Sequence, residues 1–349
     1  MAGSAGTAGA ETGATPFSAR VIGWHWRWPV LLASVAFVAL LGAVVGVHSV
    51  LGEQPILEGD HGVLGIGSHA RMLIVLSFVS AYTLGAGLFG LAKAPRELDR
   101  LRPILRLGEQ EWRAFRGRLF PNARALSIAA SIGAPVGAGL DLLSYLLRTV
   151  SQGEPSLLSL PFMILLFAVL AMQALITIRQ SQVFYEVGCQ HLEVDLLDLG
   201  ALSPFAAMGL MNAAFWLIGS ALASFLVTST ADAWIVAMVI MATVGLGIVG
   251  LVLPSLGLHL RIRERKREEL ARIREGIASE RAGLLSAAAG SPPAPRMPSL
   301  LAYEARIESV REWPFDTSTL RRFALFLLIP LASWIGGALV ERVVNAALG

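Results

Sequence analysis

Long apolar runs alternate with shorter polar segments along the whole chain. A helix needs about 20 apolar residues to cross a hydrocarbon layer about 30 Å thick, and seven runs reach or approach that length. They lie at 28–51, 72–92, 125–147, 158–178, 205–227, 234–258 and 323–340. The pattern predicts an all-α fold, a polytopic transmembrane helix bundle with seven spans.

The predicted spans form three hairpins, each followed by a polar segment, and one final span. An N-terminal tail, 1–17, is poor in bulky apolar residues and is expected to be disordered. The next segments are transmembrane hairpin 18–92, cytoplasmic helical segment 93–124, transmembrane hairpin 125–178, acidic cytoplasmic helix 179–204, transmembrane hairpin 205–258, cytoplasmic helical hairpin 259–322 and last span 323–349.

Lys and Arg fall mainly on one side of the membrane when the spans are threaded in order. With a cytoplasmic N-terminus, the inner segments hold nine, one and thirteen of them and the N-terminal tail holds two, which is 25 of the 28. Cytoplasmic loops carry an excess of Lys and Arg, so the N-terminus is predicted to be cytoplasmic. An odd number of spans then places the C-terminus on the periplasmic side of a bacterial inner membrane.

Composition agrees with a membrane protein. The chain is 55% hydrophobic and 15% charged, with a mean hydropathy of +0.64, outside the usual range for soluble domains. Its net charge of +3 and pI near 9.4 follow from the topology and from attraction to anionic lipid heads, so no nucleic-acid partner is predicted.

The first cytoplasmic segment carries an apolar stripe. Its members recur every three or four residues, as in a coiled coil, and are Leu98, Leu101, Leu105, Gly108, Trp112, Phe115 and Leu119. Pro103 lies inside the stripe and cannot donate a backbone hydrogen bond. Two shorter helices that contact other cytoplasmic helices are therefore predicted.

The other cytoplasmic segments complement this one in charge. The segment 179–204 is acidic, whereas 93–124 and 259–322 are basic. A Pro-rich linker at 289–299 allows the last segment to fold back as an antiparallel helical hairpin. Opposite charges predict that the three segments pack as one bundle; the alternative is three independent, solvated helices.

The third span holds the main functional candidates. Asp141 is the only carboxylate well inside a predicted span, and such residues are costly to bury unless paired, hydrated or protonated. Pro135 interrupts a backbone hydrogen bond, and Gly133 and Gly137 have a spacing that permits close helix approach. With Asn212, these residues are candidates for a pore or transport path, and the third span is the candidate for a pore-lining or broken helix. The alternatives are a hydrated outer carboxylate or partner of a nearby arginine, and simple helix packing.

Small residues four positions apart predict further helix-packing seams. The pairs are Thr83 with Gly87, Thr243 with Gly247, and Ser333 with Gly337. The first two belong to similar stretches of the second and sixth spans, in which Thr, three Gly and a Leu coincide. Duplication and chance both explain this similarity.

No motif for catalysis or cofactor binding is found, so no enzyme activity and no cofactor are predicted. Cys189, His191, Glu193 and Asp195 occupy alternate positions, which scatters them around a helix, and no metal site is predicted. The single cysteine excludes a disulfide within the chain.

The first hypothesis for function is a homo-oligomeric channel-like or transport protein whose cytoplasmic helices assemble subunits and couple to gating. The second is a membrane-anchored signalling or scaffold protein whose cytoplasmic helices bind a protein partner. The third is a small secondary transporter built on repeated hairpins. The lipid bilayer is an expected partner in all three.

Overall fold

The computed structural model describes residues 27–51, 68–152, 159–226, 230–286 and 296–313, with a few positions between 321 and 328. The α-helices are α2 (Arg27–Leu51), α3 (Ser68–Leu101), α4 (Glu109–Arg118), α5 (Ala123–Gln152), α6 (Leu160–Gln190), α7 (Ser203–Ala223), α8 (Thr230–Ser286) and α9 (Met297–Glu308). The 3-10 helices are η1 (Arg102–Ile104), η2 (Gly200–Leu202) and η3 (Ser224–Leu226). Apart from one isolated bridge, these ranges contain no strand, which confirms the all-α prediction for the described chain.

Five described helices are long and apolar enough to cross a membrane: α3, α5, α6, α7 and α8. They correspond to the second to sixth predicted spans. α2 coincides with the first predicted span, but its described apolar part, Leu31–Ala43, is shorter than a full span. The tail 1–17 and most of 323–349, including Ser333 and Gly337, lie outside the described residues.

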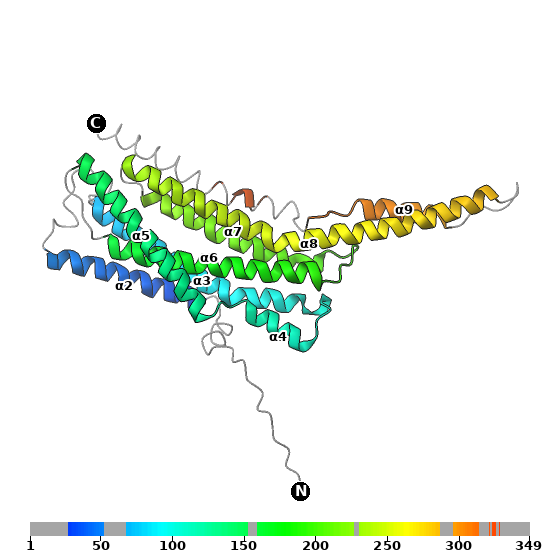
Figure 1. Ribbon diagram of the computed structural model, residues 1–349, viewed down its shortest axis with the longest axis horizontal. Coiled ribbons are helices and arrows are strands. Elements are labelled where there is room, and N and C mark those ends of the chain that lie inside the picture. The colour runs from blue at the N-terminus through cyan, green and yellow to red at the C-terminus, as the bar shows by residue number, and fades with distance from the viewer. Residues whose placement is uncertain are drawn as a thin grey trace, which may run out of the picture.

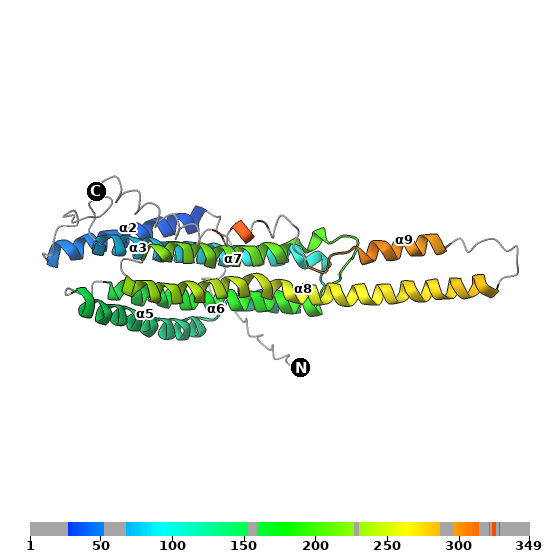
Figure 2. The same ribbon diagram turned by 90° about the horizontal axis from the view of Figure 1, so that it is seen from above.

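The helices run side by side in two layers. Figure 2 shows α2, α3 and α7 in one layer and α5, α6 and α8 in the other. Contacts of α3 with α6, and of α7 with α8, join the layers. α8 has 57 residues, about 85 Å of helix. Its second half therefore projects beyond the bundle, with α9 beside it (Figure 1).

Glycines allow close crossings between these helices. A Cβ at Gly133 or Gly137 would collide with the backbone carbonyls of Phe167 or Met163 on α6. The predicted GxxxG pair therefore lies at the α5–α6 contact, as the packing alternative requires. α5 also remains helical through Pro135, so the third span is not broken at this proline.

Two other predicted seams also lie at helix contacts. A Cβ at Gly87 on α3 would collide with the Gln173 side chain on α6, and one at Gly247 on α8 would lie 3.3 Å from the Trp216 Cβ on α7. The hydroxyls of Thr83 and Thr243 donate hydrogen bonds to carbonyls of their own helices.

An apolar core closes the end of the bundle at which α3 and α6 end, here called the charged end because most of the charged residues lie there. The buried members of this core are Ala94, Leu98, Leu101, Trp112, Phe115, Leu119, Val183, Phe184, Val187, Leu192, Leu202, Phe205, Met208, Leu258 and Ile262. Leu105 packs against them and is partly buried. The predicted stripe therefore contacts other helices of the same chain.

Pro103 separates two helices, as predicted. α3 ends at Leu101, Pro103 lies in η1, and α4 begins at Glu109. The Glu111 carboxylate accepts a hydrogen bond of 3.3 Å from the Gly108 amide and so caps α4. α3 is continuous across the predicted boundary between residues 92 and 93. The second predicted span and the start of the polar segment 93–124 therefore belong to one helix.

The predicted acidic helix 179–204 is only partly helical. α6 ends at Gln190, and residues 191–199 form an irregular loop. Its backbone pairs with the chain after η1, where the Glu193 amide donates to the Ile104 carbonyl at 3.1 Å. The carboxylates of Asp195 and Asp198 accept hydrogen bonds from amides two residues ahead. Such local bonds compete with helix formation, which explains the difference.

The predicted antiparallel helical hairpin is present as α8 and α9. The Arg274 guanidinium on α8 contacts the carboxylates of Glu304 and Glu308 on α9 at 2.8 and 2.9 Å. Nearer the bundle, the Lys266 ammonium donates to the Val310 carbonyl at 2.8 Å. α9 begins at Met297, inside the predicted linker 289–299, of which residues 289–295 are not described.

Candidate functional site

An apolar pocket with about 80 Å³ of free volume lies among α3, α5, α6, α7 and α8. Its lining residues are Met72, Leu76, Val79, Tyr82, Thr83, Leu140, Asp141, Ser144, Met163, Leu166, Phe167, Leu170, Phe215, Trp216, Gly219, Ala223, Leu226, Ile235, Val236, Val239 and Thr243. We call it the apolar pocket. It lies away from the charged end, within the apolar length of the bundle.

Asp141 supplies a carboxylate to this pocket. Its side chain is buried, with 7% of its surface exposed, and accepts a hydrogen bond of 2.7 Å from the Ser159 hydroxyl. Ser159 directly precedes α6, so this bond joins the start of α6 to α5. Gly133, Gly137 and Asp141 are four residues apart and share one helix face. That spacing was the available signal that Asp141 points toward the start of α6.

Three aromatic side chains form one wall of the apolar pocket. The rings of Tyr82 and Phe215 stack with centroids 5.8 Å apart, and Phe215 meets Trp216 edge to face at 5.0 Å. The Tyr82 hydroxyl donates to the Phe215 carbonyl at 2.9 Å, which fixes the tyrosine against α7. None of the three is predicted from the sequence, because aromatic residues in apolar spans are common and their partners come from other helices.

The candidates from the third and fifth spans do not form one site. Asp141, Thr83 and Thr243 all line the apolar pocket. Pro135 lies on the exposed side of α5. Asn212 is buried elsewhere, where its amide nitrogen donates to the Ser181 hydroxyl at 3.3 Å. This arrangement favours helix packing for Asn212 over a transport path shared with Asp141.

A second pocket, here called the charged pocket, lies at the charged end and has about 590 Å³ of free volume. It is lined by Pro103, Ile104, Glu193, Val194, Asp195, Leu196, Leu197, Arg265, Glu268, Glu269 and Tyr303. These residues come from η1, the 191–199 loop, α8 and α9. All three predicted cytoplasmic segments therefore meet here.

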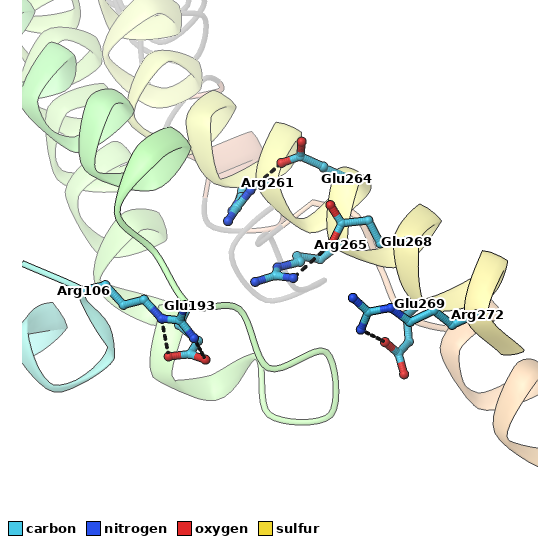
Figure 3. Close-up of polar contacts among 8 residues, drawn as sticks. All are labelled: Arg106, Glu193, Arg261, Glu264, Arg265, Glu268, Glu269 and Arg272. Atoms are coloured by element: carbon cyan, nitrogen blue, oxygen red, sulfur yellow. Dashed lines mark hydrogen bonds and ion pairs between the residues drawn. The ribbon is translucent and has the colours of Figure 1, made fainter.

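Ion pairs fix the walls of the charged pocket (Figure 3). The Arg106 guanidinium holds the Glu193 carboxylate through two nitrogens, one of them at 3.0 Å. The hydrogen bond and charge of Arg106 lower the pKa of Glu193, and Arg265 adds to this effect. The guanidinium groups of Arg261 and Arg265 extend from α8 toward the loop that carries Glu193. Complementary charge between the segments is thus present, as predicted.

Carboxylates of α8 line the opposite wall. Glu268 pairs with Arg265 at 3.0 Å, and Glu269 pairs with Arg272 at 3.7 Å. The Tyr303 hydroxyl on α9 donates to Glu269 at 3.1 Å. Burial and the Glu269 carboxylate raise the pKa of Tyr303. The tyrosine therefore remains a neutral donor that ties α9 to α8.

The described residues contain no group of three or more His, Cys, Asp or Glu side chains placed to hold a metal ion. The rings of His191 and Phe115 pack with their centroids 5.2 Å apart, and the Glu193 carboxylate accepts a hydrogen bond from Arg106. These side chains therefore have structural contacts in the charged-end core and in the wall of the charged pocket.

α8 lines both pockets. Ile235, Val236, Val239 and Thr243 border the apolar pocket, whereas Arg265, Glu268 and Glu269 border the charged pocket. The helix is uninterrupted between them, and the 22 residues from Thr243 to Arg265 span about 33 Å. One continuous helix, with Pro254 inside it, therefore contacts both sites.

Comparisons with protein-family models, with curated proteins and with solved structures find no match to this chain.

Proposed function

We propose that this chain is a membrane-anchored signalling or scaffold protein that couples the apolar pocket to a cytoplasmic module. The observation that carries this proposal is the continuity of α8, which lines the apolar pocket and the charged pocket. A ligand that fills the site at one end of a continuous helix can change the position or stability of its other end, provided that it binds two arrangements of the helix differently.

The proposed protein has seven spans, with its N-terminus in the cytoplasm and its C-terminus in the periplasm of a bacterial inner membrane. The five span-length helices and the basic residues at the charged end support this topology. In this topology the charged pocket and the α8–α9 hairpin lie in the cytoplasm, where they present a surface to a protein partner. The apolar pocket lies within the membrane.

Close packing supports transmission along α8. A Cβ at Gly257 on α8 would collide with the Tyr185 carbonyl on α6, and a Cβ at Gly209 on α7 would lie 2.7 Å from the Leu251 carbonyl. Such backbone contacts leave little room for α8 to move without its neighbours. Movement at the apolar pocket is therefore expected to reach the charged end.

A homo-oligomeric channel-like protein is the second candidate. Among the five span-length helices, α5 is the least buried. Its outer side exposes Ile128, Ile132, Val136, Leu142 and Leu146. A second copy bound to this side would place Pro135 and Gly139 at a subunit contact, and the conducting path would then run between subunits.

The test of the first proposal fills the apolar pocket by mutation. A Cβ at Gly219 makes an ordinary contact of 3.6 Å with the Tyr82 ring, so Gly219→Leu adds a side chain to the pocket. Gly139→Leu is the matched control, because nothing lies within 4 Å of that Cβ position. We expect only Gly219→Leu to slow hydrogen exchange at 262–274 and 191–199 in lipid nanodiscs.

Equal exchange in the two variants would contradict coupling through α8. The same preparations, reconstituted in liposomes, separate the other hypotheses. A signalling or scaffold protein gives no ion flux and no solute uptake. Ion flux would favour the channel, and saturable, gradient-driven uptake would favour the transporter.

A further inference from the structure

The charge of the apolar pocket limits what it can bind. Among the described residues that line it, Asp141 is the only one with a charged side chain. The carboxylate is buried, and burial disfavours its ionised form unless an opposite charge lies beside it. A ligand with a cationic group supplies that charge, whereas an anionic ligand does not.

The aromatic wall favours the same kind of ligand. Tyr82, Phe215 and Trp216 lie beside one another on α3 and α7 and all line the pocket. The face of an aromatic ring attracts cations, and alkylated ammonium groups are recognised in this way. The aromatic wall is thus compatible with a cationic amphiphile.

The remaining lining and the size of the pocket define the rest of the ligand. Most other lining side chains are aliphatic, including Leu76, Leu166 and Ile235. The free volume is about 80 Å³, roughly half of the 150 Å³ cavity that accommodates benzene in another protein. It therefore accommodates a small head group with the first part of an alkyl chain.

We propose that the apolar pocket binds an amphiphile with a cationic ammonium head and an alkyl chain. The ammonium group pairs with the Asp141 carboxylate, and the alkyl chain contacts the aliphatic and aromatic lining. This inference rests on the proposed function, because it names the ligand class of the pocket that α8 connects to the cytoplasm.

The test uses two photoreactive probes with the same ten-carbon chain, decylammonium and decanol, each with a diazirine beside the head group. The full chain is purified in a non-ionic maltoside detergent, which adds no ammonium or carboxylate. We expect saturable labelling by decylammonium, mapped to pocket residues of α3, α7 and α8. Its apparent affinity exceeds that of decanol about tenfold or more, the range for a hydrogen-bonded charge.

Two variants assign the binding to this pocket. Asp141→Asn lowers the apparent affinity for decylammonium about tenfold and leaves decanol labelling unchanged. Gly219→Leu blocks the labelling of pocket residues by both probes, and Gly139→Leu on the exposed side of α5 does not. Should Asp141→Asn fail to fold, the two probes and the Gly219→Leu variant still decide the question.

Equal affinity for the two probes would overturn the inference, because the pocket would then accept neutral chains. Labelling that Gly219→Leu leaves intact would also overturn it. The two proposals fail separately. If Gly219→Leu slows exchange at 262–274 but decylammonium does not bind, only the proposed ligand class is wrong. If decylammonium binds but Gly219→Leu does not change exchange at 262–274, only the proposed coupling through α8 is wrong.

Discussion

The Ser159 hydroxyl donates a hydrogen bond of 2.7 Å to the Asp141 carboxylate, which precedes it by 18 residues in the chain. Asp141 lies in the second half of α5 and Ser159 directly before α6, so the bond joins the two helices beyond their glycine contact at Gly133 and Gly137. It thereby holds the only charged group among the described lining residues at the edge of the apolar pocket.

Ser159→Ala tests this bond. We expect the free energy of unfolding to fall by about 1.5–3 kcal/mol, because a buried carboxylate loses a hydrogen-bond donor. Reversible unfolding in bicelles measures the change. Ser279→Ala is the control, since that exposed hydroxyl bonds only to a carbonyl of its own helix turn. Equal stability of the two variants would show that the Ser159 bond contributes nothing.

The contact between α5 and α6 depends on glycine. In Gly137→Leu the new side chain must displace the α6 backbone at Met163, and we expect a loss of about 1–3 kcal/mol or more. Gly139→Leu on the same helix meets open space and should be nearly neutral. Unfolding in bicelles again provides the measurement. A neutral Gly137→Leu would mean that α5 does not pack here.

The apolar stripe at the charged end is a core and should behave as one. Trp112 is 4% exposed, and Trp112→Ala is expected to cost about 3–5 kcal/mol. Trp234→Ala, at a position that is 80% exposed, should change stability little in a non-ionic detergent. If Trp112→Ala removes a bound partner and leaves stability unchanged, the stripe is a docking surface instead.

The Arg106–Glu193 pair predicts a pH dependence for the 191–199 loop. Arg106 lowers the pKa of Glu193 below the ordinary value of 4.5 in the folded protein. The pair therefore stabilises the loop at pH values above the ordinary pKa of Glu193. This contribution is lost as the pH falls through the lower pKa that Glu193 has in the folded protein. Amide exchange in 191–199, corrected for the intrinsic rate, should speed up below pH 4.5.

Arg106→Gln is the control for this prediction. Without the guanidinium, the Glu193 pKa returns toward its ordinary value, and the loop should exchange faster already at neutral pH. The acid-induced increase should then be smaller than in the parent protein. The same acid response in both proteins would assign it to other carboxylates.

Periodicity and proline chemistry predict much of this fold. Apart from partly buried Leu105 and exposed Gly108, the stripe from Leu98 to Leu119 identifies buried positions, because apolar side chains three or four residues apart share a helix face. Pro103 marks the break between α3 and α4, because it lacks the amide donor. The α8–α9 hairpin follows from charged helices on either side of a Pro-rich linker. These signals are local and need no knowledge of neighbouring helices.

The pocket could not be predicted in this way. Tyr82, Asp141 and Phe215 come from three helices, and apolar runs do not specify which helices become neighbours. Pro135 suggested a break in the third span that the structure does not have, because a proline within an apolar helix need not interrupt it. The loop 191–199 was also missed, since the local bonds of Asp195 and Asp198 outweigh an acidic helix pattern.

The central claim is that α8 carries the charged pocket into the cytoplasm from a pocket within the membrane. Single cysteines in a Cys189→Ser background test it with a membrane-impermeant maleimide in intact cells. Leu285 and Trp234 lie near opposite ends of α8 and are 77% and 80% exposed. We predict that Leu285→Cys reacts only after permeabilisation, whereas Trp234→Cys reacts from outside. Labelling of Leu285→Cys in intact cells would contradict the account.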